Sequence, residues 1–199
     1  HLRQQTLHKP KVDMHNGHII GGEALVRWQN DKEMIYPDQF IPVLEKNGYV
    51  IDVDNFIWNK VCACIKMMED KGIEPVPISV NVSRMHVYQE KFTENLKNMA
   101  GEYGIDPKYI PLEITESAFT KEEGSLFKKV QSLQGYGFKF SMDDFGSGYS
   151  SLGMLKSERV DEVKIDKTFV DDIATDKGKV LLGNVIRMIN ELGIDMIAE

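Results

Sequence analysis

The chain has 199 residues, of which 42% are hydrophobic and 28% charged, a composition that is typical of globular proteins and excludes a disordered one. Its net charge of −7 argues against a nucleic-acid polymer as partner, because such binding depends on neutralising phosphates with Lys and Arg. No apolar run approaches the roughly 20 residues of a membrane span, so we expect a cytoplasmic domain, with membrane attachment left open for a longer protein.

The first part of the chain predicts a hairpin followed by two helices. Asn16-Gly17 is a strong turn signal between two strand-like runs, so these strands should be antiparallel. Pro37 near its start and Gly48 just past its end mark the first helix. The predicted elements are two strands, 7–14 and 18–28, and two helices, 36–48 and 50–72.

The second helix contains the only two cysteines, Cys62 and Cys64. Residues two apart on a helix point in different directions, so a disulfide between them is not expected. A zinc site would need further ligands at the usual spacing. We therefore expect buried free thiols.

From residue 76 onward, strand-like and helix-like segments alternate to the end of the chain. The predicted strands are 76–83, 109–117, 138–145, 159–167 and 194–199. The predicted helices are 89–103, 121–134 and 177–192. This alternation is typical of a mainly parallel sheet covered by helices. No linker or low-complexity tract interrupts it, so we expect one domain over 1–199.

Polar side chains recur within or at the ends of the predicted strands. There are six such residues: Glu23, Asn81, Glu113, Asp143, Lys164 and Glu199. In a (β/α) barrel the catalytic groups gather at the carboxyl ends of the strands, so these six groups would meet at one mouth. An open doubly wound sheet could also supply such an edge, but no Gly-rich phosphate-binding fingerprint follows the first strand. The barrel is therefore favoured.

The acids Asp143 and Asp144 are adjacent in "KFSMDDFGSGYSSLGML", where their like charges repel one another. Holding them together is costly, which suggests that a cation or a reaction requires them. Carboxylate and amide oxygens suit Mg²⁺ or Mn²⁺. Four or five acids could hold two such ions about 4 Å apart, with Asp143 as a bridge, the arrangement used for in-line displacement at phosphorus. Lys164 would then orient the attacking water or offset charge on the phosphoryl oxygens.

Each of these residues also has a structural interpretation when it is taken alone. Glu23 could pair with Arg27 on the same strand, and Asn81 could satisfy backbone groups. Lys164 could belong to a salt bridge, and the segment after Asp144 could be a plain turn. Taken together, the polar groups are hard to explain as core filling, because unpaired buried charge costs several kcal/mol.

The motifs that carry these residues, in order, resemble those of the EAL-domain phosphodiesterases. They are "EALVR", "SVNVS", "LEITES", "DDFGSGYSSL", "KIDKTFV" and the closing "IAE". The resemblance implies a modified TIM-type (β/α) barrel, an α/β fold with one antiparallel strand near the N-terminus. It also implies hydrolysis of cyclic di-GMP to linear pGpG with two ions of Mg²⁺ or Mn²⁺.

Carried over by position, the resemblance implies a role for each site residue. Lys164 helps to orient the attacking water, and Glu199 is a general base or a further ligand. Glu116 holds the loop after Asp144, near an expected homodimer contact. The substrate-binding residues are Leu25 and Arg27, and the metal ligands are Glu23, Asn81, Glu113, Asp143 and Asp144. Sensor or GGDEF domains are expected as partners in a longer protein.

The chain departs from the family pattern at two places. Lys9, in His8-Lys9-Pro10, replaces a glutamine expected near the nucleotide, which could alter guanine contacts. The chain also stops at Glu199, about 50 residues short of the ~250 that are typical of such barrels, so we expect a barrel truncated at its C-terminal end. Two alternatives stay open: a non-catalytic cyclic di-GMP receptor that signals to a partner domain, and an inactive fragment.

Overall fold

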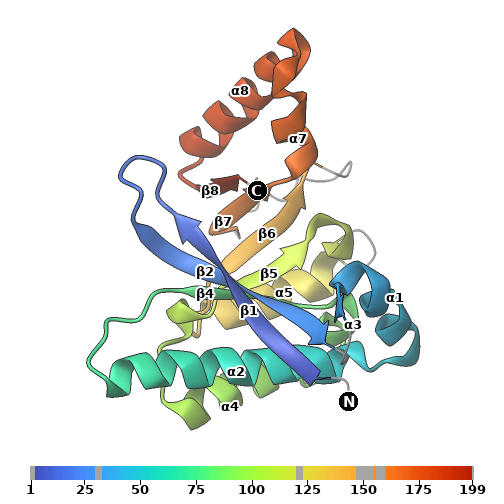
Figure 1. Cartoon of the computed structure of the whole chain (residues 1–199), viewed down its shortest axis with the longest axis vertical. Coiled ribbons are helices and arrows are strands. Elements are labelled where there is room, and N and C mark those ends of the chain that lie inside the picture. Colours follow the sequence, from blue (N-terminus) through green and yellow to red (C-terminus); the bar gives the residue numbers. More distant parts are fainter. Residues whose placement is uncertain (1–2, 30–32, 120–122, 147–154, 156–159, 199) are drawn as a thin grey trace. The chain divides into compact units, whose positions relative to one another are not determined.

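The computed structural model of the chain describes residues 3–29, 33–119, 123–146, 155 and 160–198 (Figure 1). Its contacts form two compact units. The first, here the N-terminal unit, comprises His1–Leu112 and Tyr136–Phe138. The second, here the C-terminal unit, comprises Glu113–Gly135 and Lys139–Glu199. This division concerns contacts alone, and the single domain expected over 1–199 stays a prediction.

The N-terminal unit contains the hairpin that the sequence predicts. Its strands β1 (Arg3–Val12) and β2 (Ile19–Gln29) pair in antiparallel register, which confirms the prediction. Gly17 closes the turn with a φ of 74°, in the left-handed region that favours glycine. The Asp13 carboxylate accepts hydrogen bonds from the backbone N–H of His15, at 2.8 Å, and from Nδ2 of Asn16, at 2.7 Å. Side chain and backbone therefore fix the same turn.

Strand β2 is the centre of the sheet in this unit. It pairs in parallel with β4 (Ile78–Asn81) and in antiparallel register with the short β3 (Met34–Ile35). The sequence did not predict β3, because two residues carry no readable period. The predicted strand at 76–83 is confirmed, with narrower bounds.

The helices of the N-terminal unit are α1 (Pro37–Asn47), α2 (Val50–Asp70), α3 (Arg84–Val87) and α4 (Phe92–Tyr103), with a 3₁₀ turn at Pro107–Tyr109. Helix α1 ends at Gly48, which adopts a left-handed φ of 78°, as its sequence position predicts. Helix α2 packs along α4 (Figure 1) and also contacts β2 and β4. The prediction missed α3, a single turn that is capped at its N-terminus by Ser83.

Both cysteines of α2 are free thiols, as predicted. Cys62 is fully buried, whereas Cys64 is only partly buried. Burial raises the pKa of the Cys62 thiol to about 12, so its reactive thiolate is scarce at neutral pH. Cys62 therefore belongs to the core.

In the part of the C-terminal unit that the structure describes, the strand order is β5 (Leu112–Thr115, whose first residue belongs to the N-terminal unit), β6 (Phe140–Phe145), β7 (Glu162–Ile165) and β8 (Asp195–Ala198). Strands β6, β7 and β8 pair in parallel. Most residues of β5, β6 and β7 are buried, as expected for parallel strands covered on both faces. A charged side chain in these strands therefore needs a partner.

The helices of this unit are α5 (Glu123–Gln134), α7 (Lys167–Asp171) and α8 (Asp176–Glu191), with 3₁₀ turns at Glu116–Phe119 and Asp172–Ala174. The predicted helices 121–134 and 177–192 correspond to α5 and α8, although 121–122 lie outside the described residues. The sequence analysis missed α7, which begins where the predicted strand 159–167 was taken to end. Among the described residues, no helix combines the length and the apolar character that crossing a membrane requires.

Candidate functional site

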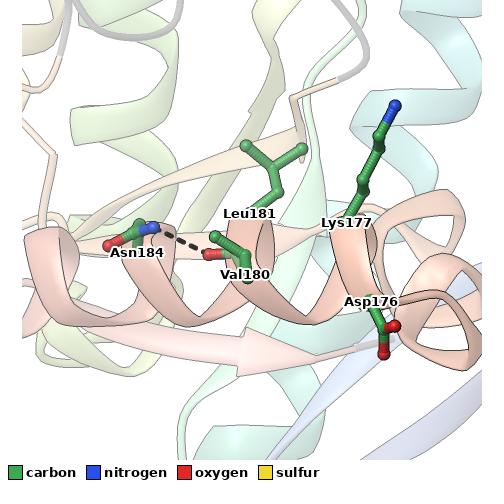
Figure 2. Close-up of a pocket in the computed structure, with 5 residues that line it drawn as sticks. All are labelled: Asp176, Lys177, Val180, Leu181 and Asn184. Atoms are coloured by element: carbon green, nitrogen blue, oxygen red, sulfur yellow. Dashed lines mark hydrogen bonds between the residues drawn. The ribbon is translucent and has the colours of Figure 1, made fainter.

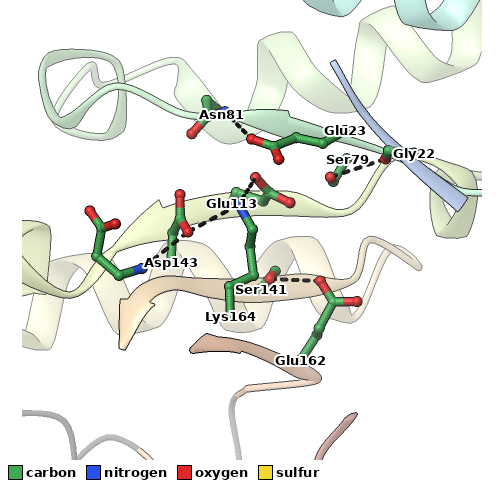
Figure 3. A network of polar contacts seen from close by, with 10 residues as sticks. Gly22, Glu23, Ser79, Asn81, Glu113, Ser141, Asp143, Glu162 and Lys164 are labelled. Atoms are coloured by element: carbon green, nitrogen blue, oxygen red, sulfur yellow. Dashed lines mark hydrogen bonds and ion pairs between the residues drawn. The ribbon is translucent and has the colours of Figure 1, made fainter. Parts of the chain in front are cut away.

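Three charged side chains from three neighbouring strands meet inside the C-terminal unit. Strand β5 supplies Glu113, β6 supplies Asp143 and β7 supplies Lys164. The Lys164 ammonium lies 3.0 Å from Oε2 of Glu113 and 3.0 Å from Oδ1 of Asp143 (Figure 3). We call these three residues the lysine cluster. Three of the six strand residues singled out by the sequence are thus brought into direct contact.

The lysine cluster is almost inaccessible to solvent. Glu113 is 1% exposed, Lys164 2% and Asp143 8%. Burial raises the pKa of the Asp143 carboxyl above its ordinary range, while the nearby Lys164 ammonium acts in the opposite direction and the Glu113 carboxylate adds to the rise. One ammonium thus faces two carboxylates, and the cluster carries unbalanced negative charge when both acids are ionised. A cation bound there would relieve this imbalance.

The adjacent acids lie on an irregularity at the end of β6. The pairing of β6 with β7 shifts register between Met142 and Phe145. Asp144 has a φ of 56° and is the one non-glycine residue with a positive φ among those the structure describes. Its backbone N–H donates to Oδ1 of Asp143 over 3.0 Å. Such bulges re-aim side chains next to functional sites, and this conformation is strained for an L-residue.

Glu116 holds the backbone that follows the two acids. This carboxylate is buried, and its Oε2 accepts a hydrogen bond of 3.3 Å from the backbone N–H of Gly146. Gly146 has a φ of 95°, and a Cβ at this position would overlap the ring of Phe169 in α7. Two independent constraints therefore require glycine here. Glu116 is expected to hold the loop after Asp144, but 147–154 of that loop lie outside the described residues, so its role there stays a prediction.

A second group of predicted site residues lies in the N-terminal unit. Nδ2 of Asn81, the last residue of β4, donates to Oε1 of Glu23 in β2 over 3.3 Å (Figure 3). We call these two residues the amide pair. Glu23 is 7% exposed, whereas Asn81 is exposed. An amide that donates through Nδ2 presents its Oδ1 as an oxygen ligand, which explains why Asn suits this position better than a second acid.

The two predicted substrate-binding residues lie on the same strand as Glu23. Leu25 and Arg27 follow Glu23 at intervals of two, so all three side chains belong to one face of β2. Both are partly buried. The Arg27 guanidinium donates to the Val26 carbonyl over 2.8 Å and lies 5.4 Å from the centre of the Tyr36 ring. Tyr36 thus helps to orient Arg27, a cation–π contact that the sequence analysis missed.

Glu199, the last predicted site residue, lies outside the described residues. A hollow of about 590 Å³ lies on α8 (Figure 2), and among the described residues its lining contains none of the predicted site residues. The sequence analysis also missed three buried residues around the end of β4: Asp54, Trp58 and His86. The spacing of Val50, Asp54 and Trp58 on one helix face could have pointed to them, because it places a charged residue in an apolar stripe.

A family model that describes the EAL domain matches residues 5–199 of the chain. The chain belongs to the EAL-domain family. Among curated proteins, it is 31% identical over 200 residues to the bifunctional diguanylate cyclase/cyclic di-GMP phosphodiesterase MucR of Pseudomonas aeruginosa, covering 99% of this chain and 29% of that protein. It is 34% identical over 198 residues to the probable cyclic di-GMP phosphodiesterase PdeB of Escherichia coli, covering 96% of this chain and 36% of that protein.

The solved structure of PaMucR phosphodiesterase in a c-di-GMP complex matches the chain with a TM-score of 0.91 and 29% identity, over 98% of this chain and 80% of that one. This likeness to an EAL protein confirms the predicted fold class, an α/β fold of the TIM-like barrel type. The chain spans about a third of the length of the curated relatives named above.

Proposed function

We propose that this EAL domain is a metal-dependent phosphodiesterase that hydrolyses cyclic di-GMP to linear pGpG. The observation that carries the proposal is the buried lysine cluster, in which Lys164 lies 3.0 Å from each of two carboxylates. The relatives named as cyclic di-GMP phosphodiesterases support the substrate class. In this reaction the oxygen of one water molecule bonds to phosphorus in line with the ester oxygen that leaves, and one ester bond of the cyclic dinucleotide opens.

The donor set suits a hard divalent cation, because every candidate ligand atom is a carboxylate or amide oxygen. The proposed ligands of Mg²⁺ or Mn²⁺ are Glu23 and Asn81 in the N-terminal unit and Glu113, Asp143 and Asp144 in the C-terminal unit. When bound, the cation supplies Lewis acidity for activating water and positive charge that offsets the phosphate. Two ions are proposed, in keeping with the number of acids.

The remaining roles follow from the chemistry of each side chain. Lys164, which lies 3.0 Å from each of two carboxylates, orients the attacking water or stabilises charge on the phosphoryl oxygens. Arg27 and Leu25 contact the dinucleotide from β2. Glu116 fixes the backbone at Gly146 and thereby the end of β6. Glu199 is proposed as a general base or a further ligand.

Hydrolysis of cyclic di-GMP in the presence of Mg²⁺ or Mn²⁺ tests the proposal. We expect Glu23→Ala to lower kcat/KM by at least about 100-fold. Mutating a residue that only orients a metal ligand already lowers metal affinity or activity by about 10–100-fold, and Glu23 is proposed as a ligand itself. Glu74→Gln, which removes an exposed acid of the same unit, is the matched control and should retain activity. EDTA should abolish turnover, and added Mn²⁺ should restore it.

Binding of cyclic di-GMP without turnover, unchanged by added metal, would contradict the enzyme and favour a receptor. Failure of the full-length protein, loaded with metal, to cleave cyclic di-GMP would also contradict the proposed enzymatic activity. A crystal soaked in Mn²⁺ gives a direct check, because anomalous peaks beside Asp143 would count the bound ions.

The partners of the full-length protein are further proposals. The curated relatives are about three times as long as the chain, and one is named as also having diguanylate cyclase activity. We propose that sensor or GGDEF domains accompany this EAL domain and that the domain forms a homodimer. Light scattering that shows only monomer at micromolar concentration would contradict the dimer.

A further inference from the structure

A buried polar group surrounds the carboxyl end of β4 and has no part in the proposed chemistry. It consists of Asp54 and Trp58 from α2, with Ser83 and His86 from the segment after β4, and we call it the β4 buttress. Asp54 is 6% exposed, and Trp58 and His86 are 1% exposed each. Polar groups at such depth are costly unless they are hydrogen-bonded, so their partners are informative.

The β4 buttress holds the backbone on both sides of Val82. The indole N–H of Trp58 donates to the carbonyl oxygen of Asn81 over 3.1 Å. Oδ2 of Asp54 accepts a hydrogen bond of 3.1 Å from the backbone N–H of Ser83. Asp54 and Trp58 are four residues apart and share one face of α2. One helix therefore holds the chain at two points immediately after β4.

Aromatic packing and a third polar contact fix the orientation of these groups. The rings of Trp58 and His86 stack at 4.3 Å with an interplanar angle of 14°, and Phe92 tilts against both. Nδ1 of His86 lies 3.2 Å from Oδ2 of Asp54. The Ser83 hydroxyl accepts from the backbone N–H of His86 over 3.3 Å. Every polar member of the buttress thus has a partner, and the indole has little freedom to turn.

We propose that Trp58 and Asp54 are positioning residues for Asn81. Asn81 is the last residue of β4, and its side chain is exposed and bonded to Glu23, so its backbone is what the buttress can fix. A cation site requires its ligands to be held within about 0.5 Å of the productive geometry. The buttress supplies that restraint from behind the ligand. This inference rests on the proposed function, in which Asn81 is a metal ligand.

Trp58→Phe tests the inference with the smallest change, because it removes the indole N–H and keeps an aromatic ring against His86. We expect Mn²⁺ binding, followed by electron paramagnetic resonance without substrate, to weaken about five-fold, since one buried hydrogen bond is worth about 1 kcal/mol. At saturating Mn²⁺, kcat should recover to within about two-fold of wild type. A displaced ligand weakens binding of the metal more than turnover once the metal is bound, and this split separates positioning from general damage.

Val61→Ala is the matched control. Val61 lies on the same helix and is fully buried, but its side chain has no polar group to offer β4. The variant should lower the midpoint of thermal unfolding through a core cavity and leave the affinity for Mn²⁺ unchanged. Asp54→Asn, which keeps the size of the side chain, should weaken Mn²⁺ binding and takes the place of Trp58→Phe if that variant does not fold.

The outcomes separate this inference from the proposed function. If wild type binds Mn²⁺ and Trp58→Phe binds it equally well, the positioning role is wrong and the proposed function stands. An equal loss of affinity in Val61→Ala would also overturn it, because any destabilisation would then suffice. If wild type neither binds Mn²⁺ nor cleaves cyclic di-GMP, the proposed function fails and the inference fails with it.

Discussion

The lysine cluster and the amide pair both contain buried carboxylates but differ in the side chain that contacts them. Both hold carboxylates in an apolar sheet. In the lysine cluster the partner of Glu113 and Asp143 is a buried ammonium. In the amide pair the partner of Glu23 is the neutral amide of Asn81, at 3.3 Å. The contacts of Lys164 in the first group join opposite charges, whereas the contact of Asn81 in the second group is a neutral hydrogen bond.

This difference separates stability from affinity for a cation. Removing one member of a buried charged group leaves an uncompensated charge in the core, which is strongly destabilising. Removing the Asn81 amide takes one neutral hydrogen bond from Glu23, which is 7% exposed, so the expected cost is that of one hydrogen bond rather than that of a lost ion pair. Damage to the lysine cluster should therefore lower folding stability strongly as well as activity, whereas damage to the amide pair should affect activity much more than stability.

Lys164→Met gives the largest expected effect on this comparison. We expect the free energy of unfolding to fall by about 3–5 kcal/mol, because two buried carboxylates lose their ammonium. Urea denaturation in EDTA measures the change, and hydrolysis of cyclic di-GMP should be lost as well. Asn81→Ala, its counterpart in the amide pair, should lower the unfolding free energy by only about 1 kcal/mol, the typical contribution of one hydrogen bond. Equal losses in the two variants would remove the distinction between the two groups.

Gly146→Ala extends the comparison to the backbone of the C-terminal unit. A Cβ here would overlap the Phe169 ring, and the φ of 95° is unfavourable for alanine. We expect a loss of about 2–4 kcal/mol in unfolding free energy, consistent with overpacking and strain together, and loss of activity through displacement of Asp143.

The matched control for that variant is Gly183→Ala. Gly183 lies within α8, and a Cβ there would meet no atom within 4 Å among the described residues. Replacing a helical glycine by alanine in open space should be neutral or stabilising by up to about 1 kcal/mol. Equal unfolding midpoints for Gly146→Ala and wild type would show that Phe169 moves aside without cost.

The sequence located the strand residues of both groups, because motifs and strand periods are local signals. Glu113, Asp143 and Lys164 were predicted to converge, and the structure places them in contact. The sequence did not show which side chain contacts each acid, the Lys164 ammonium in the lysine cluster or the Asn81 amide in the amide pair. The β4 buttress was missed for the same reason, since Asp54, Ser83 and Trp58 meet only through tertiary packing. Strand β3 and helices α3 and α7 were too short for their periodicity to register.

The pH dependence of stability provides a third test. Burial raises the folded-state pKa of Asp143, so between its ordinary pKa, about 4, and the raised value the folded state holds more protons than the unfolded state. The contribution of Asp143 to the free energy of unfolding therefore falls as pH rises through this window. In metal-free protein, Asp143→Asn should remove the fall in unfolding free energy that this carboxyl causes between its ordinary and its raised pKa. Urea unfolding at a series of pH values measures the change.

The exposed acid Asp106 supplies the opposite case. A hydrogen bond from Lys108 lowers its pKa, so its contribution is present above the ordinary pKa and is lost as pH falls through the lowered value. Asp106→Asn should therefore change the profile only at the acid end, and weakly, because solvent screens this pair. A decline above pH 4 that persists in Asp143→Asn would show that another buried acid is responsible.

Lys9→Gln should have the smallest effect and concerns the amide pair alone. Lys9 lies directly opposite Glu23 in the register of β1 and β2, so both side chains belong to one face of the hairpin. An exposed ammonium there offsets part of the carboxylate charge that a divalent cation would use. We expect the variant to bind Mn²⁺ about two- to three-fold more tightly, the scale of an exposed charge pair. Lys11→Gln is the matched control, because Lys11 faces Gly21 in the same register and should leave the affinity unchanged. The gain should disappear at about 1 M salt, where the Debye length falls to about 3 Å. A gain that survives high salt would instead point to a contact specific to glutamine.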